Sequence, residues 1–238
     1  MIQQVIETAL TFLYPAHCKV CEKTIGLESI PYLCGYCWDS LEFVTRPWCE
    51  ICGIQSNEEI CSECATTPPR YGKLRTIAFY GTILQKIIHL YKFEKKRSLA
   101  KYLSDLMIRH LPNDCNFDEY DYILPIPIHK NRLRERGFNQ SILISKGISK
   151  EIGIDICTDA LVRSKNTSPQ SSLARDARQS NIVGAFEIKN KKLIEGKRIL
   201  IFDDVYTTGA TVNEAVNMLW NEDPLEIDVL TLARTVNL

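Results

Sequence analysis

Residues 199–211 read ILIFDDVYTTGAT, and this stretch decides the fold. Its first four residues are apolar and predict a buried parallel strand. Two carboxylates, Asp203 and Asp204, stand where that strand should end. The glycine and threonines of residues 207–211 predict a tight turn, and a helix should follow from about Thr211. The order strand, turn, helix predicts an α/β fold with a mostly parallel sheet.

The turn at residues 207–211 suits a phosphate group. A helix N-terminus presents free backbone N–H groups and a partial positive charge. Gly209 allows the backbone to approach a ligand closely. The neighbouring carboxylates of Asp203 and Asp204 can accept hydrogen bonds from vicinal sugar hydroxyls. A phosphate cradle beside a pair of diol acceptors predicts a site for a ribose 5-phosphate.

Three alternative structures for this stretch agree less well with its residues. An ordinary buried strand with an acidic end and a capped helix would not account for the threonines and the glycine of the turn. The Walker B strand of an ATPase needs a partner loop of the form GxxxxGK[ST], and the sequence has none. The sequence also has no GxG, which argues against the usual dinucleotide-binding fold.

The thirteen residues resemble the signature of type I phosphoribosyltransferases, which bind 5-phosphoribosyl 1-pyrophosphate (PRPP). The resemblance implies that Asp203 and Asp204 hold the ribose hydroxyls and take part in catalysis. It also implies that Mg²⁺ accompanies PRPP. The residues expected to wrap the 5-phosphate are Thr207, Thr208, Gly209, Ala210 and Thr211.

Eight of the ten cysteines form four Cys-x-x-Cys pairs near the N-terminus. Two such pairs supply the four thiolates of a structural Zn²⁺ site, so we expect two zinc ions. Consecutive pairing would give zinc ribbons at residues 18–37 and 49–64, while interleaved pairing and an iron–sulfur cluster remain alternatives. The expected ligands are Cys18, Cys21, Cys34, Cys37, Cys49, Cys52, Cys61 and Cys64.

Charge is unevenly distributed although the formal net charge of the 238 residues is zero. Residues 1–70 carry a net charge of −5, residues 71–150 carry +8 and residues 151–238 carry −3. The middle third is therefore the candidate anion-binding face. No apolar run approaches the ~20 residues that a membrane span needs. The N-terminus has helical apolar spacing at residues 2–13 without the features of a signal peptide, so we expect a soluble cytoplasmic protein.

The basic middle third contains further predicted elements. We expect a strand at residues 75–80, helices near residues 84–90 and 98–110, and a strand at residues 122–128 that leads into a basic loop, 129–140, before a helix near Asn139. Ligands of such folds bind at the carboxyl ends of strands, so this loop suits a pyrophosphate, with Arg132 and Arg136 as its candidate ligands. A polar segment, 163–178, is expected to form a mobile lid.

Several strings outside the first stretch resemble the ComF family of proteins associated with natural competence. They are the paired Cys-x-x-Cys motifs, RERGFNQ at residues 134–140, NTSPQ at 166–170 and NIVGAF at 181–186. The resemblance covers about residues 14–235 and implies a zinc-ribbon module followed by a type I phosphoribosyltransferase fold. It also implies a role in the uptake of single-stranded DNA, with other DNA-uptake proteins as partners.

We therefore expect two domains, each on its own core: a zinc-ribbon module at residues 1–70 and a phosphoribosyltransferase-like domain at residues 71–238. One hypothesis is an enzyme that transfers the phosphoribosyl group of PRPP to an acceptor that the sequence does not identify. The alternative is a protein that binds a phosphorylated ligand or single-stranded DNA without turnover. In that case basic residues 86–101 and 130–136 would contact phosphates, while Tyr91, Phe93 and Phe138 would stack on bases.

Overall fold

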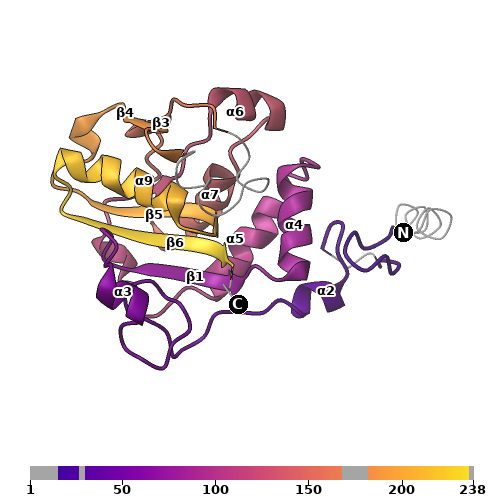
Figure 1. The fold of residues 1–238 in the computed structure, drawn as a ribbon. Coiled ribbons are helices and arrows are strands. Elements are labelled where there is room, and N and C mark those ends of the chain that lie inside the picture. The colour runs from indigo at the N-terminus through magenta and orange to yellow at the C-terminus, as the bar shows by residue number, and fades with distance from the viewer. Residues whose placement is uncertain (1–15, 27–29, 168–181, 236–238) are drawn as a thin grey trace.

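A four-stranded parallel sheet forms the centre of the molecule (Figure 1). In the computed structural model, the described residues are 16–26, 30–167 and 182–235. Buried, mostly apolar side chains on both faces explain why these strands are central. The strand order is β1-β6-β5-β2. The strands are β1 (Leu74–Phe79), β2 (Tyr122–Pro125), β5 (Arg198–Tyr206) and β6 (Glu226–Arg234).

Amphipathic helices pack around this sheet. Helix α7 packs against β2 and β5, helix α5 packs against α7, and helix α9 packs against β5. In α4 the buried residues Leu84, Ile87, Ile88 and Tyr91 recur at helical spacing, as an amphipathic helix requires. The long helices are α4 (Thr82–Lys92), α5 (Leu99–Arg109), α7 (Gln140–Ile152) and α9 (Ala210–Leu219).

Shorter elements complete the described residues. The strands β3 (Leu161–Arg163) and β4 (Phe186–Ile188) form a separate antiparallel pair beside α9. The short helices are α2 (Gly35–Asp39), α3 (Ser62–Thr66) and α6 (Lys130–Arg136). Single 3₁₀ turns occupy Phe117–Glu119, Lys191–Leu193 and Trp220–Glu222.

Both edges of the central sheet have additional hydrogen-bond partners. At the β1 edge, the amide of Val44 donates to the Ile77 carbonyl over 2.9 Å, and the amide of Leu74 donates to the Ile51 carbonyl over 2.7 Å. At the β2 edge, the amide of Ile123 donates to the Asp155 carbonyl over 2.8 Å. The segment that carries the four Cys-x-x-Cys motifs, residues 18–64, is therefore joined to the sheet by backbone hydrogen bonds. It is called the cysteine-rich segment below.

The expectation of two separate cores is wrong. Leu33, Trp38 and Leu41 of the cysteine-rich segment belong to the same buried cluster as Ile77 of β1 and the helix residues above. The two parts meet because the apolar side of each small ribbon has too little area to be buried alone. The boundary at residue 70 stays a prediction.

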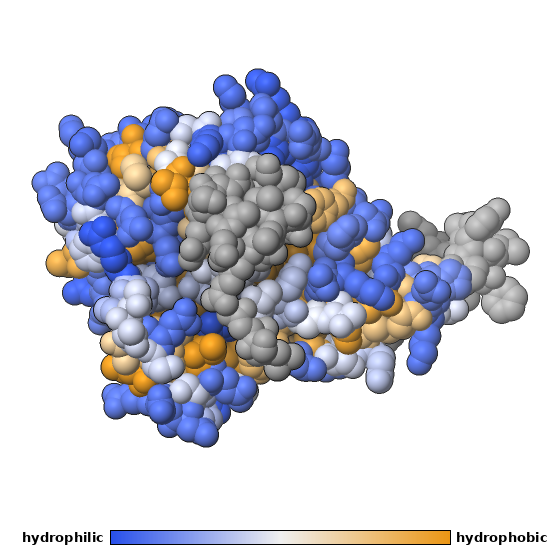
Figure 2. All heavy atoms as spheres, viewed as in Figure 1, coloured by the Kyte–Doolittle hydropathy of each residue, from blue (hydrophilic) through white to orange (hydrophobic). Residues whose placement is uncertain are grey.

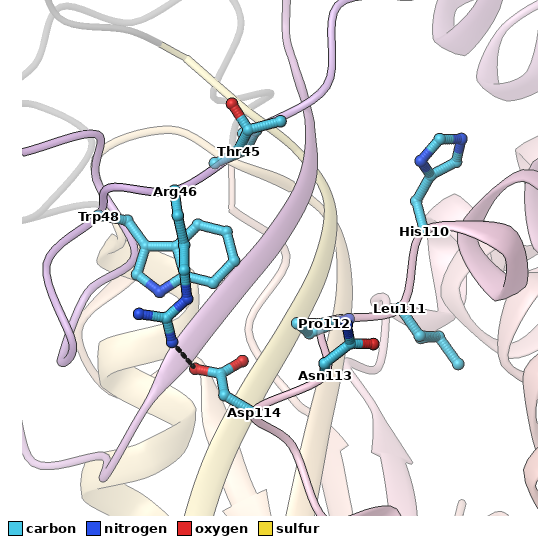
Figure 3. A pocket seen from close by; sticks show the side chains of 9 residues that line it. Thr45, Arg46, Trp48, His110, Leu111, Pro112, Asn113 and Asp114 are labelled. Atoms are coloured by element: carbon cyan, nitrogen blue, oxygen red, sulfur yellow. Dashed lines mark ion pairs between the residues drawn. The ribbon is translucent and has the colours of Figure 1, made fainter.

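An ion network also joins the two parts. Buried Arg75 donates to Asp114 over 2.6 Å and to Glu50 over 3.0 Å. Arg46 lies 3.5 Å from Asp114, beside a cavity of about 450 Å³ between residues 44–48 and 110–114 (Figure 3). The guanidinium groups of Arg46 and Arg75 lie 4.8 Å and 5.4 Å from the ring centre of Trp48.

Two predicted elements differ from the structure. Strand β5 continues to Tyr206, so Asp203 and Asp204 lie inside the strand, because pairing with β6 continues along residues 226–234. The basic stretch expected to be a loop contains α6, which His129 caps at its start and Gly137, with φ of 83°, ends. The predicted helix at residues 2–13 and most of the predicted lid lie outside the described residues.

The surface in this view is hydrophilic around α6, at the top of the molecule (Figure 2). Along the described chain, we find no helix with the length and apolar character that crossing a membrane requires.

Candidate functional site

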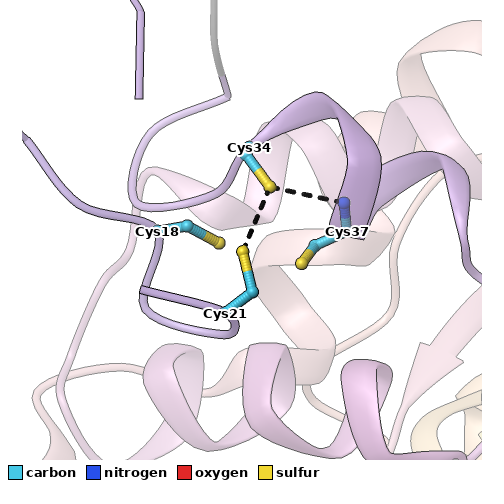
Figure 4. Close-up of side chains that lie close together, drawn as sticks. All are labelled: Cys18, Cys21, Cys34 and Cys37. Carbon is cyan, nitrogen blue, oxygen red and sulfur yellow. Dashed lines mark hydrogen bonds between the residues drawn. The ribbon is translucent and has the colours of Figure 1, made fainter. Parts of the chain in front are cut away.

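The eight cysteines of the four Cys-x-x-Cys motifs form two clusters. Within each cluster the four sulfur atoms lie within 4.8 Å of one another. Figure 4 shows the thiols of the first cluster turned toward a common centre. The first cluster contains Cys18, Cys21, Cys34 and Cys37, and the second contains Cys49, Cys52, Cys61 and Cys64. The structure thus pairs the motifs consecutively, and the interleaved alternative is not observed.

The clusters fit a structural Zn²⁺ ion. Four sulfurs at the usual Zn–S distance are about 3.8 Å apart, and the Cys21 and Cys34 sulfurs are 3.5 Å apart while those of Cys52 and Cys61 are 3.8 Å apart. Backbone N–H groups also donate to cluster sulfurs, as in the 3.4 Å contact from Val20 to Cys18. The sites are closed by four thiols each, which is the arrangement of a structural metal site.

The protonation of each cluster also favours a bound cation. Burial raises the pKa of the Cys18 thiol, but backbone N–H groups of Cys21, Cys34 and Val20 outweigh it and lower that pKa to about 6. Burial raises the pKa of Cys37 in the same cluster, and its sulfur neighbours raise it further. Four thiols this close cannot all ionise alone, and a divalent cation at the centre removes that conflict.

Asp203 and Asp204 form a buried acidic pair on β5. Lys92, the last residue of α4, places its ammonium 2.7 Å from one Asp204 carboxylate oxygen and 2.9 Å from the other. Ser141, in the first turn of α7, donates to Asp203 over 3.3 Å. Asn139 caps that helix by accepting the amide of Ser141 over 2.9 Å. The acidic pair therefore faces both a lysine and a helix N-terminus.

The buried surroundings of Asp203 favour its protonated form. Burial, and then the neighbouring Asp204 charge, raise the pKa of Asp203 to about 7, although Lys92 and Ser141 oppose the change. Perturbed carboxyl groups of this kind are common at functional sites, because burial and like charge are costly unless a ligand uses them. Such a pair can accept hydrogen bonds from a diol or bind a divalent cation.

The turn after β5 leads through Gly209 into the N-terminus of α9. Gly209 adopts φ of 75° and stands at the N-cap of α9, so the free amides of the first helical turn begin there. A side chain at Gly209 would place its Cβ atom 2.3 Å from the Tyr206 hydroxyl oxygen. The position therefore requires glycine for two reasons, its backbone angle and the lack of space. Thr208 lies beside it, and its hydroxyl oxygen is 3.4 Å from the amide of Ala210.

Arg136 and Arg163 interact electrostatically with the acidic pair, and Arg132 interacts with both of these arginines. Arg132 of α6 donates to the Thr167 carbonyl over 2.6 Å, and Arg163 of β3 donates to the hydroxyl of the same threonine. Burial lowers the pKa of Arg163 to about 10, with the charge of Arg132 as the second cause. Burial also lowers the pKa of Arg136, which the nearby Asp204 partly offsets. Cations that lower one another's pKa favour binding of an anion between them.

Sequence reasoning missed Lys92, Ser141, Arg163 and Tyr206. Lys92 begins a basic cluster that resembles a solvated turn, and only its position at the end of an amphipathic helix hints that it points inward. The predicted stacking residues Tyr91 and Phe138 are wrong, because both are buried and lie 5.3 Å apart as a ring pair. Phe93 alone of the three predicted aromatic residues is exposed.

The comparisons with known proteins agree with this geometry. The family described as a double zinc ribbon domain matches residues 9–66, and the one described as a phosphoribosyl transferase domain matches residues 139–236. The chain is 30% identical to Competence protein F of Haemophilus influenzae over 222 residues, which cover 91% of this chain and 90% of that protein. The chain belongs to the ComF family.

This ComF-family chain is also similar to two other named proteins. It is 28% identical over 227 residues to the DNA utilization protein YhgH of Escherichia coli, covering 93% of this chain and 98% of that protein. It is 26% identical over 195 residues to Competence protein ComFC of Bacillus subtilis, covering 79% of this chain and 77% of that protein. The fold is of the type I phosphoribosyltransferase class with an N-terminal zinc-ribbon module.

Solved structures overlap this ComF-family chain only in part. The glutamine PRPP amidotransferase of B. subtilis, solved with ADP and GMP, has a TM-score of 0.38 and 19% identity, covering 57% of this chain and 26% of that one. The fold class therefore follows from the domain matches and the sheet order, and not from this overlap.

Proposed function

We propose that this chain binds PRPP with Mg²⁺ and transfers its phosphoribosyl group, in a cytoplasmic step of DNA uptake or utilisation. One observation carries the proposal: a buried acidic pair, Asp203 and Asp204, lies on the strand that leads into the Gly209 turn and the N-terminus of α9. That order places a diol acceptor next to a phosphate cradle. The names of the relatives, competence and DNA utilisation, support the cellular role.

The neighbouring residues support each part of such a ligand. The turn at residues 207–211 would hold the 5-phosphate, and Asp203 and Asp204 would accept the ribose hydroxyls. Arg132 and Arg136 would neutralise the pyrophosphate, with Arg163 beside them. Asp203 and Asp204 offer the carboxylate oxygens that Mg²⁺ prefers, and that ion would supply charge neutralisation for the pyrophosphate.

Catalysis by these residues would come mainly from positioning and electrostatics. The transition state of the transfer has oxocarbenium character at the ribose, while negative charge grows on the leaving pyrophosphate. Partly buried arginines stabilise that charge better than exposed ones, because little water competes with them. The carboxylates hold the ribose in place through its hydroxyls, so that the acceptor meets the reacting carbon in line.

A ligand-induced change in thermal stability tests the binding site. PRPP with Mg²⁺ should stabilise the parent by about 2.7 kcal/mol at a hundredfold excess over the dissociation constant. Changing both Asp203 and Asp204 to alanine should abolish that gain while the free variant still folds. Equal stabilisation of the variant and the parent would show that the site is wrongly assigned.

Turnover needs its own measurement. Release of pyrophosphate from PRPP, assayed with a panel of nucleobases and amines, would show transfer. Binding without any release across the panel would favour the alternative of a non-catalytic phosphorylated-ligand protein.

A second candidate function is binding of single-stranded DNA. The observation that favours it is Phe93, which is 55% exposed and whose ring centre lies 5.5 Å from the Arg136 guanidinium. This contact brings the basic stretch after α4 beside the basic helix α6. Exposed aromatic rings beside basic residues can stack on the unpaired bases of a single strand. Other DNA-uptake proteins stay candidate partners under this proposal.

Charge reversal separates the two functions. Changing Lys95, Lys96 and Arg97 to glutamate should weaken binding of a labelled oligonucleotide and flatten its salt dependence, by about 0.7 in slope for each lost phosphate contact. Changing Arg132 and Arg136 should impair PRPP binding, and loss of Arg136 beside Phe93 should weaken oligonucleotide binding as well. If neither set alters oligonucleotide binding at low salt, this chain does not contact DNA through these residues.

A further inference from the structure

The second cysteine cluster touches the end of strand β6. The guanidinium of Arg234 donates to the backbone carbonyl of Cys52 over 2.7 Å, and Arg234 is only 6% exposed. This contact joins residues 182 positions apart in the chain. It fixes the knuckle that begins with Cys49 to the last residue of the central strand β6.

Arg234 in turn holds Tyr206. The two residues are register partners on neighbouring parallel strands, and the Arg234 guanidinium lies 5.6 Å from the centre of the Tyr206 ring. The Tyr206 hydroxyl also lies 3.4 Å from the hydroxyl of Tyr71. A cation over one part of the ring and a phenol at its tip leave the ring little freedom to turn.

Tyr206 contacts the turn at residues 207–211, called the phosphate turn here after its proposed ligand. Its hydroxyl oxygen and ring carbon Cζ lie 2.3 Å and 2.7 Å from where a Cβ atom of Gly209 would stand. Gly209 is the N-cap of α9, so its position sets the direction of the first free amides of that helix. A chain of direct contacts thus runs from Cys52 through Arg234 and Tyr206 to Gly209.

The first cysteine cluster has different neighbours. Its contacts in the described chain include the Lys86 ammonium on α4, which donates to the Val20 carbonyl over 2.9 Å. Lys96 lies 4.8 Å from the ring centre of Tyr32, which also belongs to that ribbon. These contacts lead to α4 and to the turn before α5, and the chain of contacts to Gly209 begins at the second cluster.

We infer that the second cluster, when it holds its metal, positions the phosphate turn through Arg234 and Tyr206. The residues present fit a zinc ion, and four metal–sulfur bonds would fix the backbone of the Cys49–Cys52 knuckle and so the carbonyl that Arg234 uses. Loss of that metal allows the Cys52 carbonyl to move. Arg234 and then the Tyr206 ring beside Gly209 are in turn held less firmly. The inference about ligand affinity rests on the proposed function of the turn, and the inference about its position does not.

Hydrogen–deuterium exchange without ligand tests the positioning. In Arg234→Ala, amides of residues 208–212 should exchange about tenfold faster than in the parent, as for a local opening made about 1.4 kcal/mol easier. Arg46→Ala is the matched control, because it also removes an arginine between ribbon and domain but one that contacts Asp114 and Glu50. Unchanged exchange in Arg234→Ala, with two zinc ions retained, would overturn the inference.

Two further comparisons keep the inference testable if the Arg234→Ala variant does not fold. Tyr206→Leu removes the ring below Gly209 and should reproduce the faster exchange, whereas Tyr206→Phe keeps the ring and should exchange within about twofold of the parent. Cys61→Ala removes a ligand of the second cluster and should loosen the turn. Cys34→Ala removes a ligand of the first and should leave the turn as it is; equal effects of the two cysteine changes would contradict the inference.

PRPP affinity then measures the functional consequence. Arg234→Ala should bind PRPP about tenfold more weakly than the parent, and Arg46→Ala should bind it equally well. A parent that does not bind PRPP would refute the proposed function, while the exchange data would still decide the positioning. A parent and an Arg234→Ala variant that bind PRPP equally would refute the role of the second cluster alone.

Discussion

Replacement of Lys92 by methionine isolates the charge that balances the buried acidic pair. The Lys92 side chain is 17% exposed and that of Asp204 is 4% exposed, so this is a largely buried ion pair. Methionine keeps most of the volume of the lysine side chain and removes its charge. Removing one partner of a buried pair typically costs about 3–5 kcal/mol, because the other charge is left without compensation.

The loss of folding stability should be measurable by thermal or denaturant unfolding. In a chain of this length, about 3 kcal/mol, the low end of that range, corresponds to a fall in melting temperature of roughly 6–12 °C. Lys86→Met is the matched control, since Lys86 is an exposed residue of the same helix and bonds only the Val20 carbonyl among the contacts described. That control should change stability by about 0.5 kcal/mol or less.

The pH dependence of folding stability provides a second, independent test. The pKa of Asp203 is raised in the folded protein, so its protonated form is favoured there and stability falls as pH rises from its ordinary pKa of about 4 toward 7. Because Lys92 lowers the pKa of Asp203, that pKa rises further without the lysine, and the loss of stability extends to higher pH. The difference between parent and Lys92→Met should therefore be larger at pH 8 than at pH 5.5.

Urea unfolding at the two pH values, followed by fluorescence, measures both effects. A Lys92→Met variant as stable as the Lys86→Met control at pH 8 would refute the reasoning. So would a stability difference that does not change with pH, because the lost interaction would then not be electrostatic.

Three other outcomes are expected. Native mass spectrometry should find two zinc ions per chain, and full titration of the eight cluster thiols in the folded, metal-free protein would contradict this. PRPP affinity should rise with pH through the pKa of Asp203, because the ionised carboxylate is the better diol acceptor, and Asp203→Asn should flatten the profile measured by calorimetry. Gly209→Ala should cost about 1–3 kcal/mol in denaturant unfolding, because its φ of 75° and its contact with Tyr206 exclude a side chain; an unaffected midpoint would show that the turn can relax.

Local patterns were enough to predict the local structure around the candidate site where it depends on neighbouring residues. The acidic pair, the Gly209 turn and the four Cys-x-x-Cys motifs each lie within a few residues, so their spacing alone indicates their geometry. The fold class followed from the same strand–turn–helix stretch. The structure places Asp203 and Asp204 on β5 and Gly209 at the N-cap of α9, and it pairs the Cys-x-x-Cys motifs consecutively.

The parts that sequence reasoning missed depend on contacts between distant residues. Lys92 pairs with a residue 112 positions away, which no local pattern reveals. Tyr91 carries a hydroxyl and stands in a basic stretch, yet its hydroxyl donates to the Gln140 carbonyl inside the core. The basic residues of 130–136 suggested a loop, but the caps at His129 and Gly137 make a helix of them.

The hydrogen bonds at the edge of β1 have a consequence for solubility. An open strand edge is a template on which a second chain can extend the sheet, and proteins commonly cover such edges to prevent aggregation. Here the cover comes from residues 42–44 and Ile51 of the cysteine-rich segment. A fragment that begins after residue 70 would expose the β1 edge together with the apolar surface beneath Trp38 and Leu41. We therefore expect the cysteine-rich segment to hinder edge-to-edge self-association, a role that does not depend on any ligand.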